Sequence, residues 1–158
     1  MYSNKKIILE ILTINDADFL YQLYSHPQLA LNFDESPFLP NETPQQFVQR
    51  IISSCDFIYR IKPTDQPDLI IGDCALHHWY HNTKELFIGG SLFPEYWGQG
   101  YMQAAFELLI GIAKQKLGAK WLIGQTKTRN HKAIRLAEKM GFKKYQFDEQ
   151  DTLLRKEI

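Results

Sequence analysis

Two glycines separated by one residue, Gly98 and Gly100, have the spacing of a loop that binds a phosphate group. The preceding residues Phe87, Ile88 and Leu92 suit a β-strand, and an amphipathic helix follows without a break. Glycine adopts the positive φ angles that turn successive N–H groups toward one point. The helix start adds further unpaired N–H groups and the positive end of its dipole. This segment therefore predicts an anion site suited to a pyrophosphate.

Two well-known phosphate loops are excluded by the residues around the glycines. A P-loop needs Lys followed by Ser or Thr after its second glycine, where this chain has Tyr101 and Met102. A dinucleotide-binding loop needs a third glycine, where Gln103 stands, and an acidic residue about twenty positions later at the end of the next strand. That strand, predicted over residues 121–125, ends in Gln and is followed by Thr.

A second motif lies thirty residues further along the chain, over residues 130–142. Asn130 is a good N-cap, and Gly141 supplies the left-handed stop of a short helix. The helical spacing predicts one apolar face, made of Ala133, Ile134, Ala137 and Met140.

Together the two motifs resemble the GNAT superfamily of acetyltransferases. Its acetyl-CoA loop reads Gln/Arg-X-X-Gly-X-Gly/Ala after a strand, and its later helix begins Asn-X-X-Ala/Ser and ends in Gly-Phe. Residues 94–101, Pro-Glu-Tyr-Trp-Gly-Gln-Gly-Tyr, look most like the branch that acetylates N-terminal alanine amines of ribosomal proteins. The resemblance covers about residues 7–156. It implies an N-acetyltransferase that moves an acetyl group from acetyl-CoA to a primary amine, with no metal.

The same resemblance implies a cofactor site. In this family two neighbouring strands part at their ends, and the free backbone of the first strand pairs with the pantetheine arm. This assigns the backbone of Ser91 and Leu92 to the pantetheine and thioester, and it places Asn130 near the cofactor. The residues expected around the pyrophosphate are Trp97, Gly98, Gln99, Gly100, Tyr101 and Met102.

Four positions depart from the family pattern. Trp97 stands where many members have Arg or Gln, and Met102 replaces a small residue, so that it either crowds the loop or faces the core. The glutamate common in this branch, seven residues before the proline of the loop, is Phe87 here. The tyrosine that serves many members as general acid would fall at Ala137 and is missing.

The candidates for proton transfer are therefore few. Glu85 lies two residues before the usual carboxylate position and on the same strand face, which makes it our first candidate for the base. His77 and His78 are adjacent, so one is expected on each side of their strand. Asp34 and Glu35 could contact a cationic substrate from a loop. Four aromatic residues are expected in the core or its rim rather than in a substrate cage: Trp79, Tyr80, Tyr96 and Trp97.

Composition agrees with one domain spanning residues 1–158, since the chain is long enough to bury a sizeable core. The formal net charge is zero, which implies no broad attraction to nucleic acid or to a membrane. The first residues lack the apolar core of a signal peptide, so a cytoplasmic location is expected, as a monomer or homodimer. Cys55 and Cys74 have no metal or redox spacing and are expected to be reduced and buried.

The predicted elements describe an α/β (α+β) fold, a mixed and mostly antiparallel twisted sheet with a central parallel strand pair and helices on both faces. The parallel pair would be residues 85–92 and 121–125, joined by a right-handed helical crossover. Strands are predicted over residues 6–12, 57–61, 69–80, 85–92, 121–125, 143–147 and 152–156, helices over 13–26, 44–54, 102–117 and 130–141, and an irregular stretch over 27–40. Thr43 is the expected cap of the second helix with Pro44 at its first position, and Gly118 is the expected stop of the third.

Two other functions stay open at this stage. The missing tyrosine and the shifted glutamate permit a domain that binds acyl-CoA without transferring the acyl group. An enzyme for a small amine, such as a polyamine, an amino acid or an aminoglycoside, is the other alternative to an enzyme for a protein terminus.

Overall fold

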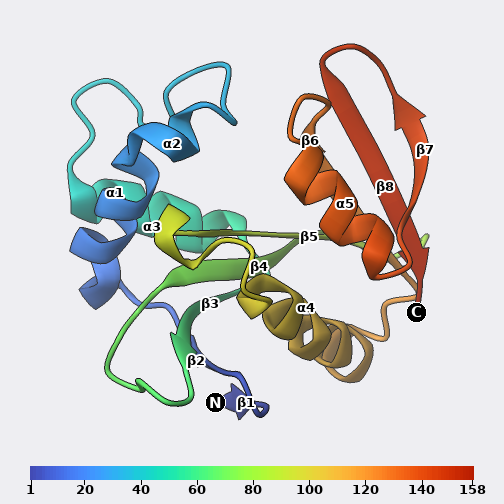
Figure 1. Ribbon diagram of the computed structural model, residues 1–158, viewed down its shortest axis with the longest axis horizontal. Helices are drawn as coiled ribbons and strands as arrows, with labels where there is room; N and C mark the ends of the chain where they lie inside the picture. The colour runs from blue at the N-terminus through green and yellow to red at the C-terminus, as the bar shows by residue number, and fades with distance from the viewer.

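The computed structural model describes residues 1–158 and builds them around one eight-stranded sheet in the order β1-β2-β3-β4-β5-β6-β8-β7 (Figure 1). Every neighbouring pair of strands is antiparallel except β5 and β6, which are parallel. The predicted mixed sheet with a central parallel pair is confirmed. The strands are β1 (Tyr2–Ser3), β2 (Ile7–Ile11), β3 (Phe57–Pro63), β4 (Gly72–Tyr80), β5 (Glu85–Leu92), β6 (Trp121–Lys127), β7 (Lys143–Phe147) and β8 (Asp151–Glu157).

Helices cover both faces of this sheet. α4 and α5 pack on one face, over a core that includes Leu86, Ile88 and Leu122. α1 and α3 pack on the other face, over Ile58 and Ala75. No helix is long and apolar enough to cross a membrane. The helical segments are η1 (Ile14–Asp16), α1 (Ala17–Ser25), α2 (Pro27–Ala30), α3 (Pro44–Ser54), η2 (Pro94–Tyr96), α4 (Tyr101–Ile112), the π-helical turn η3 (Ala113–Leu117) and α5 (His131–Lys139).

Local signals set most helix ends where the sequence predicts them. Thr13 and Thr43 each form a capping box. The threonine hydroxyl oxygen accepts a backbone N–H of the helix, and the side chain at the third helical position accepts the threonine's own N–H. Gly118 and Gly141 have φ angles of 65° and 91°, the left-handed conformation that ends a helix.

Two predictions about these elements are wrong, and one strand was missed. The stretch 27–40 is not wholly irregular, because His26 caps the short helix α2 and Pro27 occupies its first position. The strand predicted from Leu69 begins at Gly72. The short strand β1 was not predicted, since its two residues pair with β2 only through the fold.

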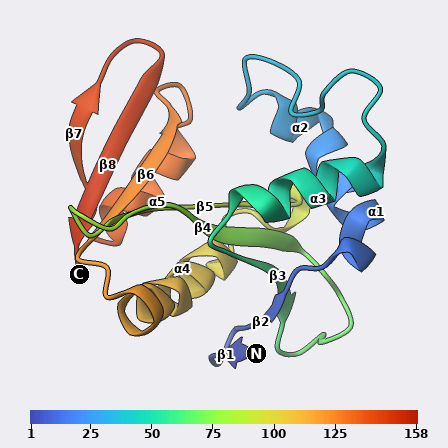
Figure 2. The ribbon, with the colours of Figure 1, turned by 180° about the vertical axis from the view of Figure 1, so that it is seen from behind.

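The parallel pair is short. Glu85 to Phe87 of β5 pair with Trp121 to Ile123 of β6, and beyond that point the strands part. β5 continues beside β4 as far as Leu92, while β6 continues beside β8. Figures 1 and 2 show the result: β6, β8, β7 and α5 lean away from α1, α2 and α3 on either side of the parting strands.

Candidate active site

The parting strands leave backbone groups of β5 without a strand partner. Ser91 points its own groups toward β4, because its N–H donates to the Asp73 carboxylate over 3.2 Å and its carbonyl oxygen lies against Gly72. Neighbouring strand residues alternate in direction, so the backbone groups of Gly90 and Leu92 face the side that β6 has left. The backbone groups on the open edge of β5 are therefore those of Gly90 and Leu92. Ser91 was predicted together with Leu92 to contact the pantetheine, but its backbone faces β4 instead.

The loop after β5 provides a second set of free donors. The backbone N–H groups of residues 98 to 103 make no hydrogen bond within the protein, and the first bond at this end of α4 runs from Ala104 N–H to the Gly100 carbonyl. Gly98 and Gly100 have φ angles of 73° and 84°, as their spacing predicts. Consecutive unpaired N–H groups at the start of a twelve-residue helix form an anion site.

A lysine that sequence reasoning missed lies beside this loop. Lys6, the residue just before β2, places its Nζ 3.2 Å from the point where a Cβ on Gly100 would stand. The same ammonium lies 5.1 Å from the centre of the Tyr101 ring. It brings a positive charge to the predicted phosphate loop from more than ninety residues away, so no local motif could have found it.

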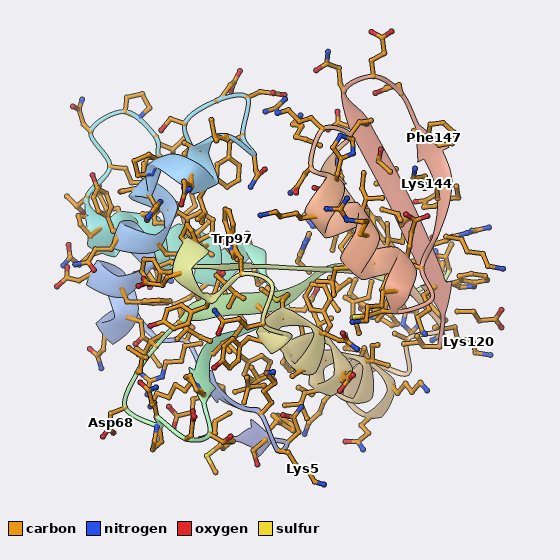
Figure 3. All side chains as sticks on the ribbon, in the orientation of Figure 1. Lys5, Asp68, Trp97, Lys120, Lys144 and Phe147 are labelled. Carbon is orange, nitrogen blue, oxygen red and sulfur yellow. The ribbon has the colours of Figure 1, made fainter.

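Trp97 and Met102 have structural roles at this loop. The Trp97 indole N–H donates to the Leu92 carbonyl over 2.9 Å, which ties the loop to the end of β5. Lys132 of α5 lies 5.2 Å from the Trp97 ring centre. Met102 faces the core, with its terminal methyl 2.9 Å from where a Cβ on Gly90 would stand, so it fills the space left by that glycine. Trp97 is labelled in Figure 3 where the two parts of the molecule diverge.

An open cleft of about 590 Å³ lies beside this loop. One wall comes from the region of α2, one from the loop around η2 and one from the first turn of α5. It therefore opens where β5 and β6 diverge. Its lining residues are His26, Gln28, Pro94, Glu95, Trp97 and Lys132.

The two adjacent histidines lie on the same side of β4, contrary to the prediction. A β-bulge interrupts the pairing between His77 and Tyr80, and His78 has a φ angle of 55°. The bulge cancels the usual alternation, so both rings contact Phe87, with centres 5.6 and 5.7 Å from it. Their Nδ1 atoms lie 2.5 Å apart, a hydrogen bond that needs one ring to donate and the other to accept.

Glu85 lies before the strands part. It pairs with Trp121 in the parallel ladder and with Tyr80 across β4. Burial and the Glu85 charge together raise the pKa of the Tyr145 hydroxyl, which places Glu85 beside β7. Glu85 lies four positions before Gly89, the first residue on its face beyond the ladder, and this corresponds to about 13 Å along a strand.

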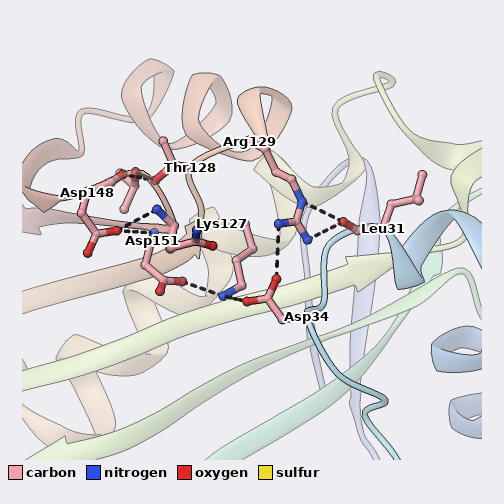
Figure 4. A network of polar contacts seen from close by, with 9 residues as sticks. Leu31, Asp34, Lys127, Thr128, Arg129, Asp148 and Asp151 are labelled. Carbon is pink, nitrogen blue, oxygen red and sulfur yellow. Dashed lines mark hydrogen bonds and ion pairs between the residues drawn. The ribbon is translucent and has the colours of Figure 1, made fainter.

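The Asp34 carboxylate is already paired with cationic side chains of the protein itself. It forms ion pairs with Lys127 and with Arg129, the latter at 3.3 Å (Figure 4). Hydrogen bonding from Lys127 lowers the pKa of Asp34. Arg129 also donates to the Leu31 carbonyl at 2.9 and 3.1 Å, and Lys127 contacts Asp151 at 3.0 Å. We call this group the bridge, since it joins the loop after α2 to the end of β6 across the parting strands.

A buried carboxylate lies behind the open edge. Asp73 is 2% exposed, and it accepts hydrogen bonds from the Tyr24 hydroxyl at 3.1 and 3.3 Å besides the bond from Ser91. No cation contacts it, and burial raises its pKa to about 7. Sequence reasoning missed this residue, although one acid inside an apolar strand was a usable signal.

The remaining predicted residues have simpler surroundings. Asn130 accepts the Ala133 N–H over 3.3 Å and so caps α5. Glu35 is exposed. The four aromatic residues do not form one cluster: Tyr96 contacts Tyr101 near the loop, whereas Trp79 and Tyr80 lie at the other end of β4. Cys74 is buried and Cys55 is half-buried, and both are free thiols.

Comparison with known proteins agrees with this geometry. The family model described as an acetyltransferase (GNAT) domain matches residues 6–143. The uncharacterized N-acetyltransferase p20 of Bacillus licheniformis is 23% identical over 146 residues, which cover 89% of this chain and 80% of that protein.

Two solved structures share the fold. RimL, a ribosomal L7/L12 alpha-N-protein acetyltransferase in complex with coenzyme A, has a TM-score of 0.79 at 13% identity. The spermidine N-acetyltransferase of Vibrio cholerae, in complex with CoA and spermine, has a TM-score of 0.78 at 14% identity. Each comparison covers 98% of this chain and 96% of the other.

The fold and the family match define a group-transfer enzyme, and the chain belongs to the GNAT family of acetyltransferases. It is an acetyl-CoA-dependent acyltransferase of the N-acetyltransferase type. The two solved relatives act on different acceptors, a ribosomal protein and spermidine, so the shared fold does not choose between a protein and a polyamine.

Proposed function

We propose that this protein binds acetyl-CoA between β5 and β6 and transfers its acetyl group to the primary amine of a protein N-terminus. The observation that carries the proposal is the open edge of β5 beside the unpaired N–H groups of residues 98 to 103. Gly90 and Leu92 would pair with the pantetheine arm, and the loop from Trp97 to Met102 would bind the pyrophosphate. Lys6 and Lys132 would add positive charge, and Asn130 would lie near the cofactor.

The reaction then needs positioning more than special groups. The free amine attacks the thioester carbonyl carbon, the C–S bond breaks, and coenzyme A leaves as a thiolate that takes up a proton. Backbone N–H groups at Gly90 or Leu92 would polarise the carbonyl, an effect commonly worth a few kcal/mol. A side chain beside the open edge, directly or through a water, would carry the proton transfer.

The charge of the cleft favours an acceptor with one ammonium group. Its lining carries one carboxylate, Glu95, together with His26 and Lys132. Of the two acids expected to contact a cationic substrate, Asp34 is paired with Lys127 and Arg129, and Glu35 does not line the cleft. A polyamine would need several free carboxylates, whereas a peptide N-terminus needs only one.

Calorimetry with acetyl-CoA, followed by a thiol-release assay over a panel of amines, tests the function. The panel contains peptides with free N-termini, spermidine, amino acids and an aminoglycoside. We expect acetyl-CoA binding, and thiol release fastest with the peptides. Binding without thiol release from any amine would indicate a non-catalytic acyl-CoA domain, and release with spermidine alone would indicate the small-amine alternative.

The loop assignment has its own test in Gly100→Val. A branched side chain at this φ angle would stand where the backbone must approach a phosphate, so we expect acetyl-CoA affinity to fall by at least tenfold. Gly118→Val is the matched control, because Gly118 has a similar φ angle of 65° and ends the same helical segment away from the loop. A folded Gly100→Val variant that binds acetyl-CoA as tightly as Gly118→Val would refute the loop assignment.

A further inference from the structure

We propose that His77 is the general base that deprotonates the acceptor amine, with His78 as its positioning residue. This inference rests on the proposed function. Phe87, the last residue of β5 that pairs with β6, cannot accept a proton. His77 lies directly opposite Phe87 across the β4–β5 ladder, with the two ring centres 5.6 Å apart.

The base would stand beside the point where the strands part. Gly89 is the first residue on this face of β5 beyond the ladder with β6. The Nε2 atom of His77 lies 4.0 Å from the point where a Cβ on Gly89 would stand, and apart from Gly89 and its two chain neighbours no other residue comes as near to that point. The glycine therefore leaves room for an amine between the strand and the imidazole. Glu85, by contrast, is separated from this opening by the Phe87 side chain.

The hydrogen bond between the two histidines can hold His77 in the tautomer whose Nε2 is unprotonated, which a general base needs. When the His77 Nδ1–H donates to His78 Nδ1, the Nε2 atom of His77 carries a free lone pair directed toward Gly89. The bulge at His78 makes this bond possible, since a regular strand would place the two rings on opposite faces. The strained φ angle of His78 is thus connected to the orientation of His77.

The surroundings of His77 favour its neutral form. Burial and the neighbouring His78 lower the pKa of His77, while Asp56 raises it. Asp56 accepts the Trp79 N–H over 3.1 Å. Two further acids lie on this face of the sheet: Asp73, four residues before His77 on β4, and Glu85 of β5, beyond Phe87. A neutral imidazole can accept a proton, whereas an imidazolium cannot.

The proton balance of the step is simple. The acceptor ammonium gives one proton to His77 Nε2, and the resulting amine nitrogen attacks the thioester carbon. The C–N bond forms, the C–S bond breaks, and the second proton of the nitrogen passes to the departing thiolate. His77 then returns its proton to solvent, so the net products are the acetylated amine, coenzyme A and one proton.

His77→Gln tests the base, with His81→Gln as the matched control, because His81 is exposed and lies in the turn after β4. We would measure kcat/KM against pH with the best amine of the panel, acetyl-CoA affinity by calorimetry and the thermal midpoint. His77→Gln should lose roughly a hundredfold in rate near pH 7 with unchanged acetyl-CoA affinity. Its rate should then rise with pH only as the free amine does, and His81→Gln should match the wild type.

The wild-type profile is a second measurement that needs no variant. The wild-type kcat/KM should fall at low pH with a midpoint below the ordinary histidine pKa, in addition to the fall caused by protonation of the amine. An active wild type without the fall at that midpoint, or a folded His77→Gln variant as active as His81→Gln, would overturn the role of His77 and leave the proposed function intact. A wild type that releases no thiol with any amine would refute the proposed function itself.

Discussion

At the scale of single residues, the buried carboxylate of Asp73 makes stability depend on pH. Burial raises its pKa to about 7 in the folded protein, whereas an unfolded aspartate titrates near 4. The folded state therefore holds a proton that the unfolded state loses as pH rises from about 4 to about 7. The carboxyl group consequently favours unfolding increasingly across this range, by up to about 4 kcal/mol above pH 7.

Asp73→Asn should remove this dependence. The amide oxygen can still accept from Tyr24 and Ser91, but no charge is buried. Urea unfolding should show the variant more stable than the wild type at pH 8, and the difference should shrink steadily as pH falls to about 4. Asp68→Asn, in an exposed turn labelled in Figure 3, is the control. A stability difference that stays constant with pH would contradict this account of Asp73.

Residue-level predictions held where the cause is local. The positive φ angles of Gly98 and Gly100 follow from glycine spacing alone. The arrangement of the histidines did not follow, because a bulge in the pairing of β4 with β5 changed the direction of His78. The Asp73–Ser91 bond also depends on the register between two strands, which one sequence without pairing information does not contain.

At the scale of elements, Asn130 caps α5, and our proposal also assigns it to the cofactor site. It accepts the Ala133 N–H, so Asn130→Ala should lower the free energy of unfolding by about 1 kcal/mol. If the side chain also lies beside acetyl-CoA, the same change should weaken acetyl-CoA binding or slow turnover. Denaturant unfolding and calorimetry measure the two effects separately.

Thr43→Ala is the matched control for this prediction. Thr43 caps α3 through an equivalent bond to the Gln46 N–H at 3.1 Å, on the other face of the sheet. It should cost a similar stability and leave acetyl-CoA affinity unchanged. If Asn130→Ala behaves in the same way as Thr43→Ala, Asn130 is a cap and nothing more.

Elements with strong end signals were predicted well, and short ones were not. The Thr43–Pro44 start of α3 and the Gly118 stop after α4 lie where the sequence indicates. α2 was missed because four residues are too few for a periodic pattern, and its cap is a histidine nitrogen rather than a common capping side chain.

At the scale of the whole molecule, the bridge connects the two parts that diverge beyond the β5–β6 ladder. Arg129→Ala removes the donors to the Leu31 carbonyl and to Asp34. Hydrogen exchange over residues 31–34 should become faster, and acetyl-CoA should dissociate several times faster because the loop no longer spans the opening. The thermal midpoint should change little, since exposed ion pairs contribute little stability.

Arg50→Ala provides a close comparison. Arg50 holds the same loop by donating to the Pro37 carbonyl and to Glu42, both at 2.8 Å, but on the side of α3. Its loss should speed exchange over residues 37–42 and leave acetyl-CoA dissociation unchanged. Equal effects of the two variants on dissociation would show that the bridge has no special connection with the cofactor.

The overall fold was predictable through two motifs that belong to one family, and the match over residues 6–143 agrees with them. The bridge and the approach of Lys6 to Gly100 were not, because each joins residues about a hundred positions apart. Such contacts depend on how the strands twist and part. The identity of the amine acceptor depends on the same long-range contacts, and for that reason it is the least predictable property of the protein.

The parted strands also have a consequence for solubility. Unpaired strand edges are sites where other chains can add and aggregation can begin, so most proteins protect them at the rim of a sheet. This protein has two such edges in the middle of its sheet, where β5 and β6 diverge. A bound cofactor would complete the sheet much as an extra strand does. Binding of acetyl-CoA would therefore protect the enzyme from aggregation as well as supply its acetyl group.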